Sequence, residues 1–237
     1  MAKELLPSNQ IVKIQTNRQL IAMRDKLCPA APECYAHLHA DGEEINGVKT
    51  YSRIGIVMLD YTNGKGENTV QVKHNISPAI AEYLFRYATA PDFHFYEIKT
   101  FGQNGNAQYT SLSIDKYAYT QDGQPNEYPW FIKIANGYGV LKTNAIGGQY
   151  IQKGSQKENA SVTIRVSDKD YFMLLAHTCN YIHVWEAMMT PTNIQYGINL
   201  YQSYLQQRIL DNRPQQQHNQ SSPYDGYGWD TGYAQVS

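Results

Sequence analysis

Two segments of the chain alternate apolar with polar residues and then lead, through a serine, into a helical pattern. Residues 68–76 form the first such segment and residues 161–166 the second. Alternation of this kind predicts a β-strand with one buried face. Ser77 followed by Pro78, and Ser167 with an acidic residue three positions later, are typical helix starts. The sequence therefore predicts a strand followed directly by a helix at two places.

Further strands are expected before each of these strand–helix pairs. Gly- and Asn-rich turns separate runs of apolar and aromatic residues throughout both halves. In the first half, strands are expected over residues 35–40, 45–49, 51–61 and 68–76, with turns at Asp41-Gly42 and at 63–66. In the second half, strands are expected over residues 93–101, 107–120, 129–135, 138–142 and 161–166, with a turn at Asn136-Gly137. Residues 54–59 are apolar on both faces, which predicts that a helix or a second subunit covers them.

Helices and a tail account for the rest of the chain. Residues 1–34 are expected to be a leader in which residues 19–27 form two helical turns before Cys28-Pro29. The long helix after Ser167 is expected to end at Pro191, and residues 193–210 to form another helix. Residues 213–237 are rich in Gln, Asn, Ser and Gly with a few aromatic residues, which predicts a disordered tail.

Together these elements predict an α+β fold built from a duplicated unit. Residues 35–212 form the core, in which residues 35–91 and 92–190 each hold about four antiparallel strands plus a helix. The extra C-terminal helix and the disordered tail follow. The alternative is an ordinary α+β protein in which two hairpin–helix pieces look alike by chance.

This organisation resembles the Whirly and PUR-repeat proteins, which bind single-stranded nucleic acid. The resemblance covers about residues 49–190 and rests on the unit order and on local texture, above all FIKIANGYGVLK at 131–142 and SVTIRVSDKDYFMLLAHTCNYI at 161–182. The lysine-glycine-lysine signature of plant Whirly proteins is absent, and residues 63–66 are its nearest counterpart. The resemblance implies a non-catalytic protein that binds single-stranded DNA.

Composition narrows the classes of protein that fit. The 237 residues carry 20 Lys and Arg against 21 Asp and Glu, a net charge of -1, so a strongly basic binder of duplex nucleic acid is unlikely. We expect no membrane span and no secretory signal, and three cysteines do not suggest a disulfide framework. The expected location is the reducing cytoplasm. The common nucleotide-binding, zinc-protease and serine-hydrolase motifs are missing, so neither a catalytic centre nor a cofactor is expected.

The chain holds 20 tyrosines, and several share predicted strand faces with lysine or arginine. Aromatic faces for bases and cations for phosphates are what non-specific single-strand binding requires. Base stacking is expected on Tyr96, Tyr109, Tyr117, Tyr119, Phe131 and Tyr138. Phosphate contacts are expected from Arg53, Lys65, Lys73, Lys99, Lys133, Lys142 and Arg165. The second unit should carry more of the contact than the first.

The expected partner is therefore single-stranded DNA, with RNA as a further possibility, bound by a homo-oligomer of phage or mobile-element origin. The alternative is a structural or protein-interaction module, such as a virion or assembly component, whose Tyr-rich sheets form the oligomer surface. Tyrosine also favours strands for purely structural reasons.

Three smaller features leave alternatives open. Cys28, Cys34, His37 and His39 either bind zinc or stay unliganded, and their spacing matches no common zinc site. Cys179 with its flanking histidines is either a nucleophile pair or, on the apolar stripe of a helix, a small hydrophobic residue. The tail is either an inert solubilising segment or a site for a protein partner, as in bacterial single-strand-binding proteins, whose tails it resembles in arrangement. In both cases it should be dispensable for the fold.

Overall fold

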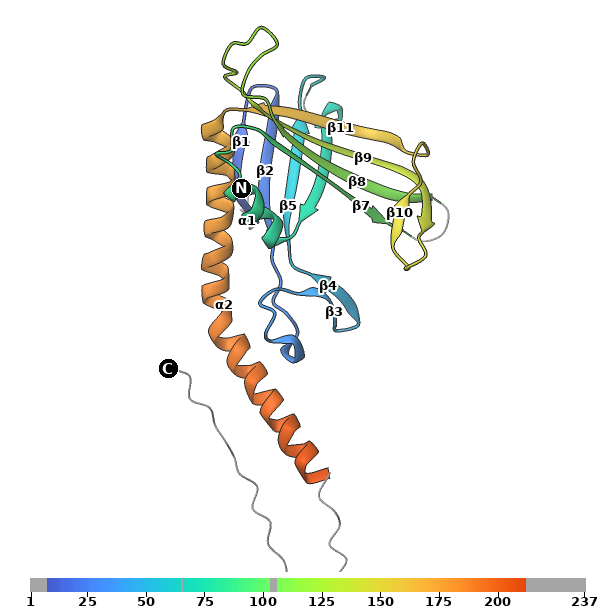
Figure 1. Cartoon of the computed structure of the whole chain (residues 1–237), viewed down its shortest axis with the longest axis vertical. Helices are drawn as coiled ribbons and strands as arrows, with labels where there is room; N and C mark the ends of the chain where they lie inside the picture. Colours follow the sequence, from blue (N-terminus) through green and yellow to red (C-terminus); the bar gives the residue numbers. More distant parts are fainter. Residues whose placement is uncertain (1–7, 65, 103–105, 212–237) are drawn as a thin grey trace, which may run out of the picture.

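Eleven antiparallel strands and two α-helices make up most of the computed structural model, which describes residues 8–64, 66–102 and 106–211. The first sheet has the order β1 (Gln10–Gln15), β2 (Gln19–Lys26), β5 (Arg53–Asp60) and β6 (Val70–Ile76). The second places β7 (Phe93–Phe101), β8 (Asn106–Lys116), β9 (Trp130–Thr143) and β11 (Lys157–Val166) side by side, with β10 (Gln149–Ile151) paired to the end of β9. A separate hairpin of β3 (Asp41–Ile45) and β4 (Val48–Tyr51) lies between β2 and β5 in the chain (Figure 1).

Each sheet is a meander that leads into a helix, which confirms the α+β class. The strand β6 is followed by α1 (Pro78–Arg86), where the Ser77 hydroxyl accepts a hydrogen bond from the backbone N–H of Ile80. The strand β11 is followed by α2 (Asp168–Asp211), where the Ser167 hydroxyl accepts from the N–H of Asp170. Both caps satisfy N–H groups that the first turn of a helix leaves free.

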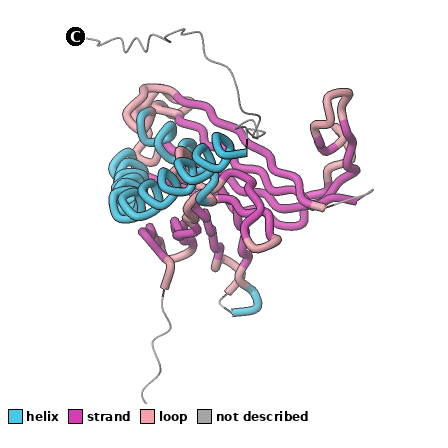
Figure 2. Tube along the Cα trace, turned by 90° about the horizontal axis from the view of Figure 1, so that it is seen from below, coloured by secondary structure: helices cyan, strands magenta, loops and turns pink. Residues whose placement is uncertain are grey.

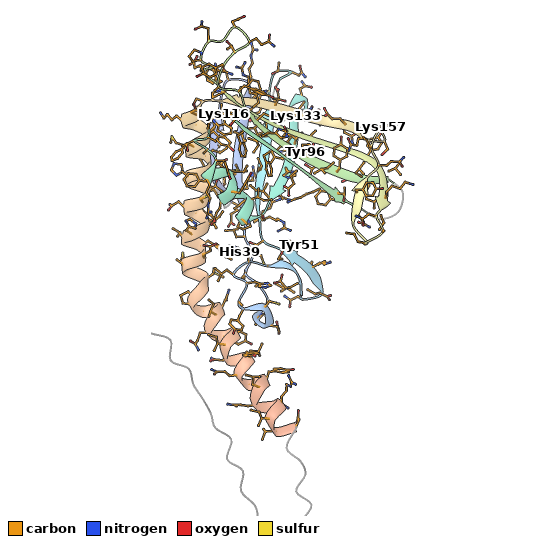
Figure 3. All side chains as sticks on the ribbon, viewed as in Figure 1. His39, Tyr51, Tyr96, Lys116, Lys133 and Lys157 are labelled. Carbon is orange, nitrogen blue, oxygen red and sulfur yellow. The ribbon has the colours of Figure 1, made fainter. Side chains whose placement is uncertain are left out.

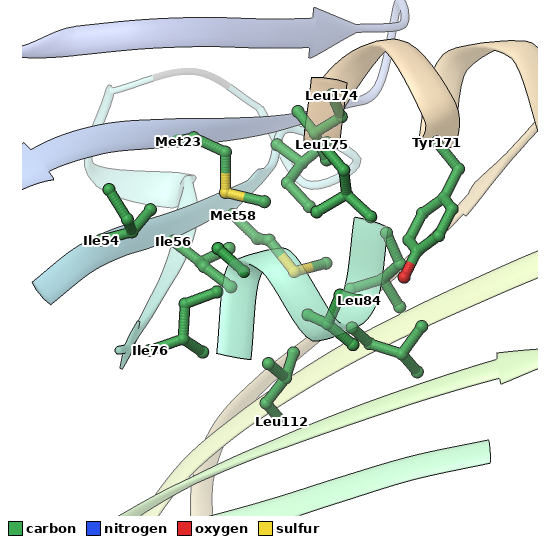
Figure 4. Packing of buried hydrophobic residues seen from close by; sticks show 14 of the residues in the cluster. Met23, Ile54, Ile56, Met58, Ile76, Leu84, Leu112, Tyr171, Leu174 and Leu175 are labelled. Atoms are coloured by element: carbon green, nitrogen blue, oxygen red, sulfur yellow. The ribbon is translucent and has the colours of Figure 1, made fainter. Parts of the chain in front are cut away.

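The two helices pack together on one side of the strands (Figure 2). The core lies between these helices and the two sheets. Ile56 and Met58 from β5, Leu84 from α1 and Leu112 from β8 are at most 1% exposed and meet Leu174 and Leu175 of α2 (Figure 4). Burying an aliphatic side chain of this size contributes about 1.5–3 kcal/mol. The hydrophobic effect therefore fixes how the two sheets lie on the helices.

The outer strand of the first sheet, β6, lies across the inner face of the second sheet. The Asn136 side chain of β9 accepts a hydrogen bond from the backbone N–H of Lys73 and donates one to its carbonyl. The Thr110 hydroxyl donates to that Lys73 carbonyl as well, over 2.8 Å. The ammonium of Lys99 donates to the carbonyl of Asn75. An edge strand otherwise presents unpaired backbone groups. Side chains of the second sheet therefore close this edge and hold the two sheets at an angle.

The N-terminal segment is part of the first sheet, so the expected leader over residues 1–34 is corrected. Of residues 19–27, expected to be helical, Gln19–Lys26 form β2 between β1 and β5. Four consecutive side chains, Leu20 to Met23, are buried. An apolar run covered on both faces has no strand-like alternation, so its local pattern does not separate a strand from a helix. The first unit therefore starts near Gln10 rather than at residue 35.

The small hairpin differs from the expectation in its position and its turn. Residues 35–40 form no strand: the short 3-10 helix η1 (Pro32–Cys34) precedes a turn, and His39 makes only an isolated bridge to Pro29. The hairpin turns at Asn46-Gly47, with φ angles of 53° and 76°, instead of at Asp41-Gly42. Positive φ at both central residues is what a tight two-residue hairpin requires.

The expected turn at Asn136-Gly137 is also wrong, because β9 runs straight through it. A Cβ atom on Gly137 would lie 2.2 Å from the carbonyl oxygen of Lys157 and 2.8 Å from the ring of Tyr109. Glycine is thus present here to let neighbouring strands and a tyrosine ring approach the backbone. Asn136 instead makes the hydrogen bonds with Lys73 that join the two sheets.

The two C-terminal helices expected on either side of Pro191 are one helix, α2, of 44 residues. Proline has no N–H to donate to the preceding turn, and such positions usually bend a helix. Figure 1 shows that the two halves of α2 are inclined to each other. The lower half continues beyond the sheets and passes η1. The predicted tail over residues 213–237 lies outside the described residues.

Within the part of the chain that the structure describes, no helix is long and apolar enough to cross a membrane.

Candidate nucleic-acid interface

The face of the first sheet that points away from the core is basic. Strand register places Lys73 beside Val57 and Ala22, and places Lys26 beside Arg53. The same face carries Arg24 and Lys13 on β2 and β1. The cations on this face come from four strands: Lys13, Arg24, Lys26, Arg53 and Lys73. The remaining polar side chains of this face, such as Gln71 and Asn75, are neutral.

The far half of the second sheet extends past this basic face and forms the other wall of a groove. The row Phe101, Gln108, Tyr138 and Lys157 lies on the same face of that sheet as Asn136. Figure 3 shows Lys157 at the far end of the second sheet and Tyr51 below it, where the hairpin joins β5. Two adjoining hollows share Lys26, Asn75 and Phe101, so the groove is continuous from Gln71 to Tyr51. The residues lining the two hollows together are Lys26, Tyr51, Arg53, Gln71, Lys73, His74, Asn75, Lys99, Thr100, Phe101, Gln108, Tyr109, Thr110, Asn136, Gly137 and Asn159.

The groove concentrates positive charge. None of the described residues that line it is a carboxylate; Glu97 lies just outside, 3.3 Å from Lys99, and Asp41 lies 4.0 Å from Arg53. Burial lowers the pKa of Lys26, and the charges of Lys73 and Arg24 lower it further. Burial also lowers the pKa of Lys99, although Glu97 opposes the shift. Cations that repel one another in this way are stabilised by a bound anion.

Aromatic rings lie among these cations. Tyr51 is 41% exposed and has the guanidinium of Arg53 4.5 Å from its ring centre. Phe101 is 48% exposed at the point that both hollows share. Tyr138 lies in the same row of the second sheet, with the ammonium of Lys157 5.9 Å from its ring centre. The groove thus combines both elements of a non-specific single-strand site.

A buried histidine fixes the position of Lys99. His74 is 1% exposed, and its ring nitrogens lie 3.2 Å from the Thr110 hydroxyl and 2.9 Å from a carboxylate oxygen of Glu97. Burial opposes the ionisation of Glu97, but the hydrogen bond with His74 and the charge of Lys99 outweigh it and lower the pKa of that carboxyl. The ionised Glu97 therefore holds Lys99 at the groove.

The opposite face of the second sheet carries a second aromatic surface. Tyr96 and Lys133 point outward from it, and Phe131 lies between Tyr117, whose ring centre is 5.2 Å away, and the Arg165 guanidinium at 4.7 Å. Its charges are largely paired: Lys133 lies 3.3 Å from Glu158, and His94 pairs with Asp115. This outer face therefore lacks the uncompensated charge of the groove.

The residues predicted as phosphate or base contacts are divided between these surfaces. Arg53, Lys73 and Lys99 line the groove, and Tyr138 shares a face with its far wall. The outer face or the adjoining β8–β9 loop holds Tyr96, Tyr117, Tyr119, Phe131, Lys133 and Arg165. Lys142 is exposed opposite Tyr150 at the end of β9, and Lys65 lies outside the described residues.

The prediction that Tyr109 stacks on a base is corrected by the burial of its side chain. Only 7% of it is exposed, because its ring packs over Gly137 beside Ala107 and Ile151. A ring enclosed in this way has no free face for a base. The side chain instead supports the far half of the second sheet.

Sequence reasoning missed Lys26 and Phe101, which both lie where the two hollows meet. The local pattern predicts a helix around Lys26, and a helix assigns that side chain no strand face. Phe101 follows Lys99 by two residues along β7, and this spacing alone predicts that the two side chains share a strand face. It points to the groove only once the sheets are known to cross.

The zinc hypothesis finds no support in the geometry. Across residues 8–64, 66–102 and 106–211, no group of three or more His, Cys, Asp or Glu side chains is arranged to hold a metal. The ring nitrogens of His39 each lie 2.9 Å from another side chain, the Ser52 hydroxyl and the Glu186 carboxylate, and the ring stacks on Trp185. His39 therefore ties the hairpin region to α2.

Cys179 behaves as a core residue. It is 2% exposed, and burial together with the charge of Glu82 raises the pKa of its thiol to about 11. A buried thiol that stays protonated is a poor nucleophile. This geometry favours the small-hydrophobe interpretation of Cys179.

Comparison of the chain with protein-family models, with curated proteins and with solved structures finds no match.

Proposed function

We propose that the chain is a non-catalytic single-stranded DNA-binding protein that holds the strand in the groove between its two sheets. The observation that carries the proposal is that Lys26, Arg53, Lys73 and Lys99 lie with exposed aromatic rings along two adjoining hollows that are lined by no described carboxylate. The cations would neutralise successive phosphates, and the rings would stack on bases.

Preference for a single strand follows from where the rings lie. Tyr51 and Phe101 line the groove itself. Bases in a duplex already stack on each other, so their faces are not open to a side chain in a groove. An unpaired strand can turn its bases toward the rings while its phosphates follow the lysines. RNA offers the same phosphates and base faces, so it is the first competitor to test.

The fold supports the same proposal. Two four-stranded meanders, each followed by a helix, are the arrangement on which the resemblance to Whirly and PUR-repeat proteins rests. In this chain the first meander starts at β1, and the hairpin of β3 and β4 is an insertion in it. The angle between the meanders creates the groove.

The test is fluorescence anisotropy with a labelled oligothymidine, its duplex and an RNA of the same length. We expect single-strand selectivity and a strong dependence on salt. Each phosphate contact on a single strand contributes about -0.7 to the slope of log K against log salt, so four contacts should weaken binding about 50-fold between about 50 and 200 mM salt. Equal affinity for the duplex, or no binding at low salt, would refute the proposal. Tighter binding of RNA than of DNA would mean that the groove holds single-stranded RNA.

The outer face of the second sheet supports a second candidate, a protein-interaction or assembly module that self-associates there. Tyr96, Tyr117 and Tyr119 are each at least 55% exposed on that side of the molecule. Light scattering coupled to size exclusion would detect the oligomer. This candidate would be favoured if a Tyr96→Ser, Tyr117→Ser variant is monomeric where the parent chain is an oligomer, and if neither the parent nor the variant binds DNA.

A further inference from the structure

An apolar groove runs along α2, on a part of the molecule distinct from the basic groove. Its upper part is a cavity of about 270 Å³ between α2, η1 and the hairpin, with Tyr35, Trp185, Met189 and Ile194 in its walls. Its lower part, which shares Pro32 and Tyr35 with the cavity, is lined by Leu200, Tyr201 and Tyr204. Leu200 and Tyr204 are 37% and 56% exposed. The groove therefore presents aromatic and aliphatic surface to solvent.

The two parts are held in a fixed relation by a tight contact. Gly197 of α2 is buried under η1, and a Cβ atom there would lie 2.1 Å from the Cβ of Tyr35. His39 adds its link to Glu186, which directly follows the cavity-lining Trp185 in α2. Because both sides are fixed, the groove is formed before any partner arrives, which reduces the entropy lost on binding.

The length of the groove selects the class of partner. Along α2 it extends from Trp185 to Gln207. At 1.5 Å per residue these 22 steps span about 33 Å, or about six helical turns. That exceeds a small molecule and suits an elongated peptide. An amphipathic helix laid in an apolar groove is a common form of peptide recognition.

The charge around the groove selects the partner further. Apart from Asp41, which lies 4.0 Å from Arg53 of the basic groove, residues 28–51 hold three carboxylates, Glu33, Glu43 and Glu44, against the single cation Lys49. Glu33 lines the lower part. Among the described residues, the Oε1 atom of Glu43 is buried and has no hydrogen-bond donor. Arg208 is the opposing cation, stacked over Tyr204 near the C-terminal end of α2.

The Glu43 carboxylate lies close to the cavity itself. Its Oε1 atom lies 3.8 Å from the Nδ1 atom of His37, which lines the cavity. The pKa of the Cys28 thiol, which also lines the cavity, is raised by burial and then by the charge of Glu43. The upper end of the groove is therefore suited to a cation.

We propose that this groove binds a basic amphipathic helical segment of a partner protein. The apolar face of the segment packs on Tyr35, Leu200 and Tyr204, while its lysines and arginines lie against Glu33, the carboxylate that lines the groove. Acidic surroundings disfavour nucleic acid here, so strand and partner occupy different faces. The inference does not depend on the proposed DNA-binding function.

The experiment uses a display library of random 16-residue peptides on the full chain, counter-selected on a Leu200→Ser, Tyr204→Ser variant. We expect enriched peptides with a net positive charge and apolar residues at i, i+3, i+4 and i+7. Synthetic copies should bind the full chain at least 10-fold more tightly than the double variant. Glu33→Lys should weaken them severalfold. Leu210→Ser, an exposed apolar position of α2 outside the groove, is the matched control and should leave affinity unchanged.

Several outcomes would overturn the proposal. One is an enriched pool without basic amphipathic character, or peptides that bind the double variant as well as the parent. Another is a dimer, measured by light scattering, that the double variant dissolves, because a second copy would then be the occupant. Circular dichroism checks folding, which should persist since both substituted side chains are exposed.

Discussion

Asn136 makes two hydrogen bonds with the backbone of Lys73: its Nδ2 donates to the carbonyl and its Oδ1 accepts from the N–H, both over 3.0 Å. A primary amide is the side chain that can pair with both groups of one residue at once. The pair joins the outer strand of one sheet to the inner face of the other. It therefore sets the angle between the two walls of the basic groove.

Replacing Asn136 by Ala should destabilise the fold and weaken DNA binding together. The change leaves the backbone N–H of Lys73 without its partner, which costs about 1–3 kcal/mol when the group is shielded from water. Urea unfolding measures the loss. Asn180→Ala, at an exposed site on α2, is the control and should change little. Equal, small effects of the two substitutions would mean that the joint does not depend on Asn136.

Gly137→Ala should be among the most damaging single-methyl additions in the chain. The new Cβ would overlap the Lys157 carbonyl and the Tyr109 ring, and overpacking of this kind costs about 1–3 kcal/mol or more. Thermal unfolding measures the effect. The matched control is Gly148→Ala, where the new atom meets the movable end of the Asn144 side chain. A Gly137→Ala protein as stable as the Gly148→Ala protein would contradict the close strand approach.

The Asn136-Gly137 pair shows where sequence reasoning succeeded and where it failed. Alternation with a capping serine identified both strand–helix junctions, because those signals are local. Asn-Gly is also a local signal for a turn, yet here the two residues serve contacts between strands distant in sequence. The buried run Leu20 to Met23 carries no alternation at all, so only its pairing with β1 and β5 makes it a strand.

The candidate site is predictable only in part, because it too depends on contacts between strands that are distant in sequence. The outward faces of β6 and β9 were assigned correctly from alternation. Which face meets which depends on the crossing of the sheets, and no local pattern encodes that angle. Lys73 and Lys133 both occupy the polar positions of alternating strands, so the sequence does not distinguish them. In the fold, Lys73 lies in the groove and Lys133 lies on the outer face.

Removing groove cations should reduce both affinity and its dependence on salt. Lys26→Gln and Lys73→Gln should each lower the magnitude of the slope of log K against log salt by about 0.7, the share of one phosphate contact. Lys133→Gln is the matched control, because that lysine lies on the outer face and pairs with Glu158. If Lys133→Gln changes the slope as much, the strand lies on the outer face instead.

Groove aromatics should matter more than those of the outer face. Tyr51→Ala and Phe101→Ala should each cost about 1–3 kcal/mol of binding free energy, the value of one stacked base. Phe131→Ala should cost less, although the sequence alone favoured Phe131 over Tyr51. Anisotropy titrations, on variants shown by circular dichroism to be folded, measure the difference. A greater loss with Phe131→Ala would place the strand on the second sheet, as first expected.

Raising the pH should weaken DNA binding before an ordinary lysine loses its charge. A lysine binds phosphate in its protonated form, and the pKa values of Lys26 and Lys99 are lowered by burial and by neighbouring cations, Lys73 and Arg24 for Lys26 and Arg53 for Lys99. A lowered pKa means that the charge, and with it the affinity, is lost at a lower pH than the usual value of about 10.4. A bound phosphate favours the charged form, so binding in this range should also take up protons, which calorimetry in buffers of different ionisation enthalpy detects. Arginine stays charged throughout, so a Lys26→Arg, Lys99→Arg variant should keep its affinity in the pH range, below the ordinary lysine pKa, where the parent chain loses it. The same decline in both proteins would show that these two amines do not contact the strand.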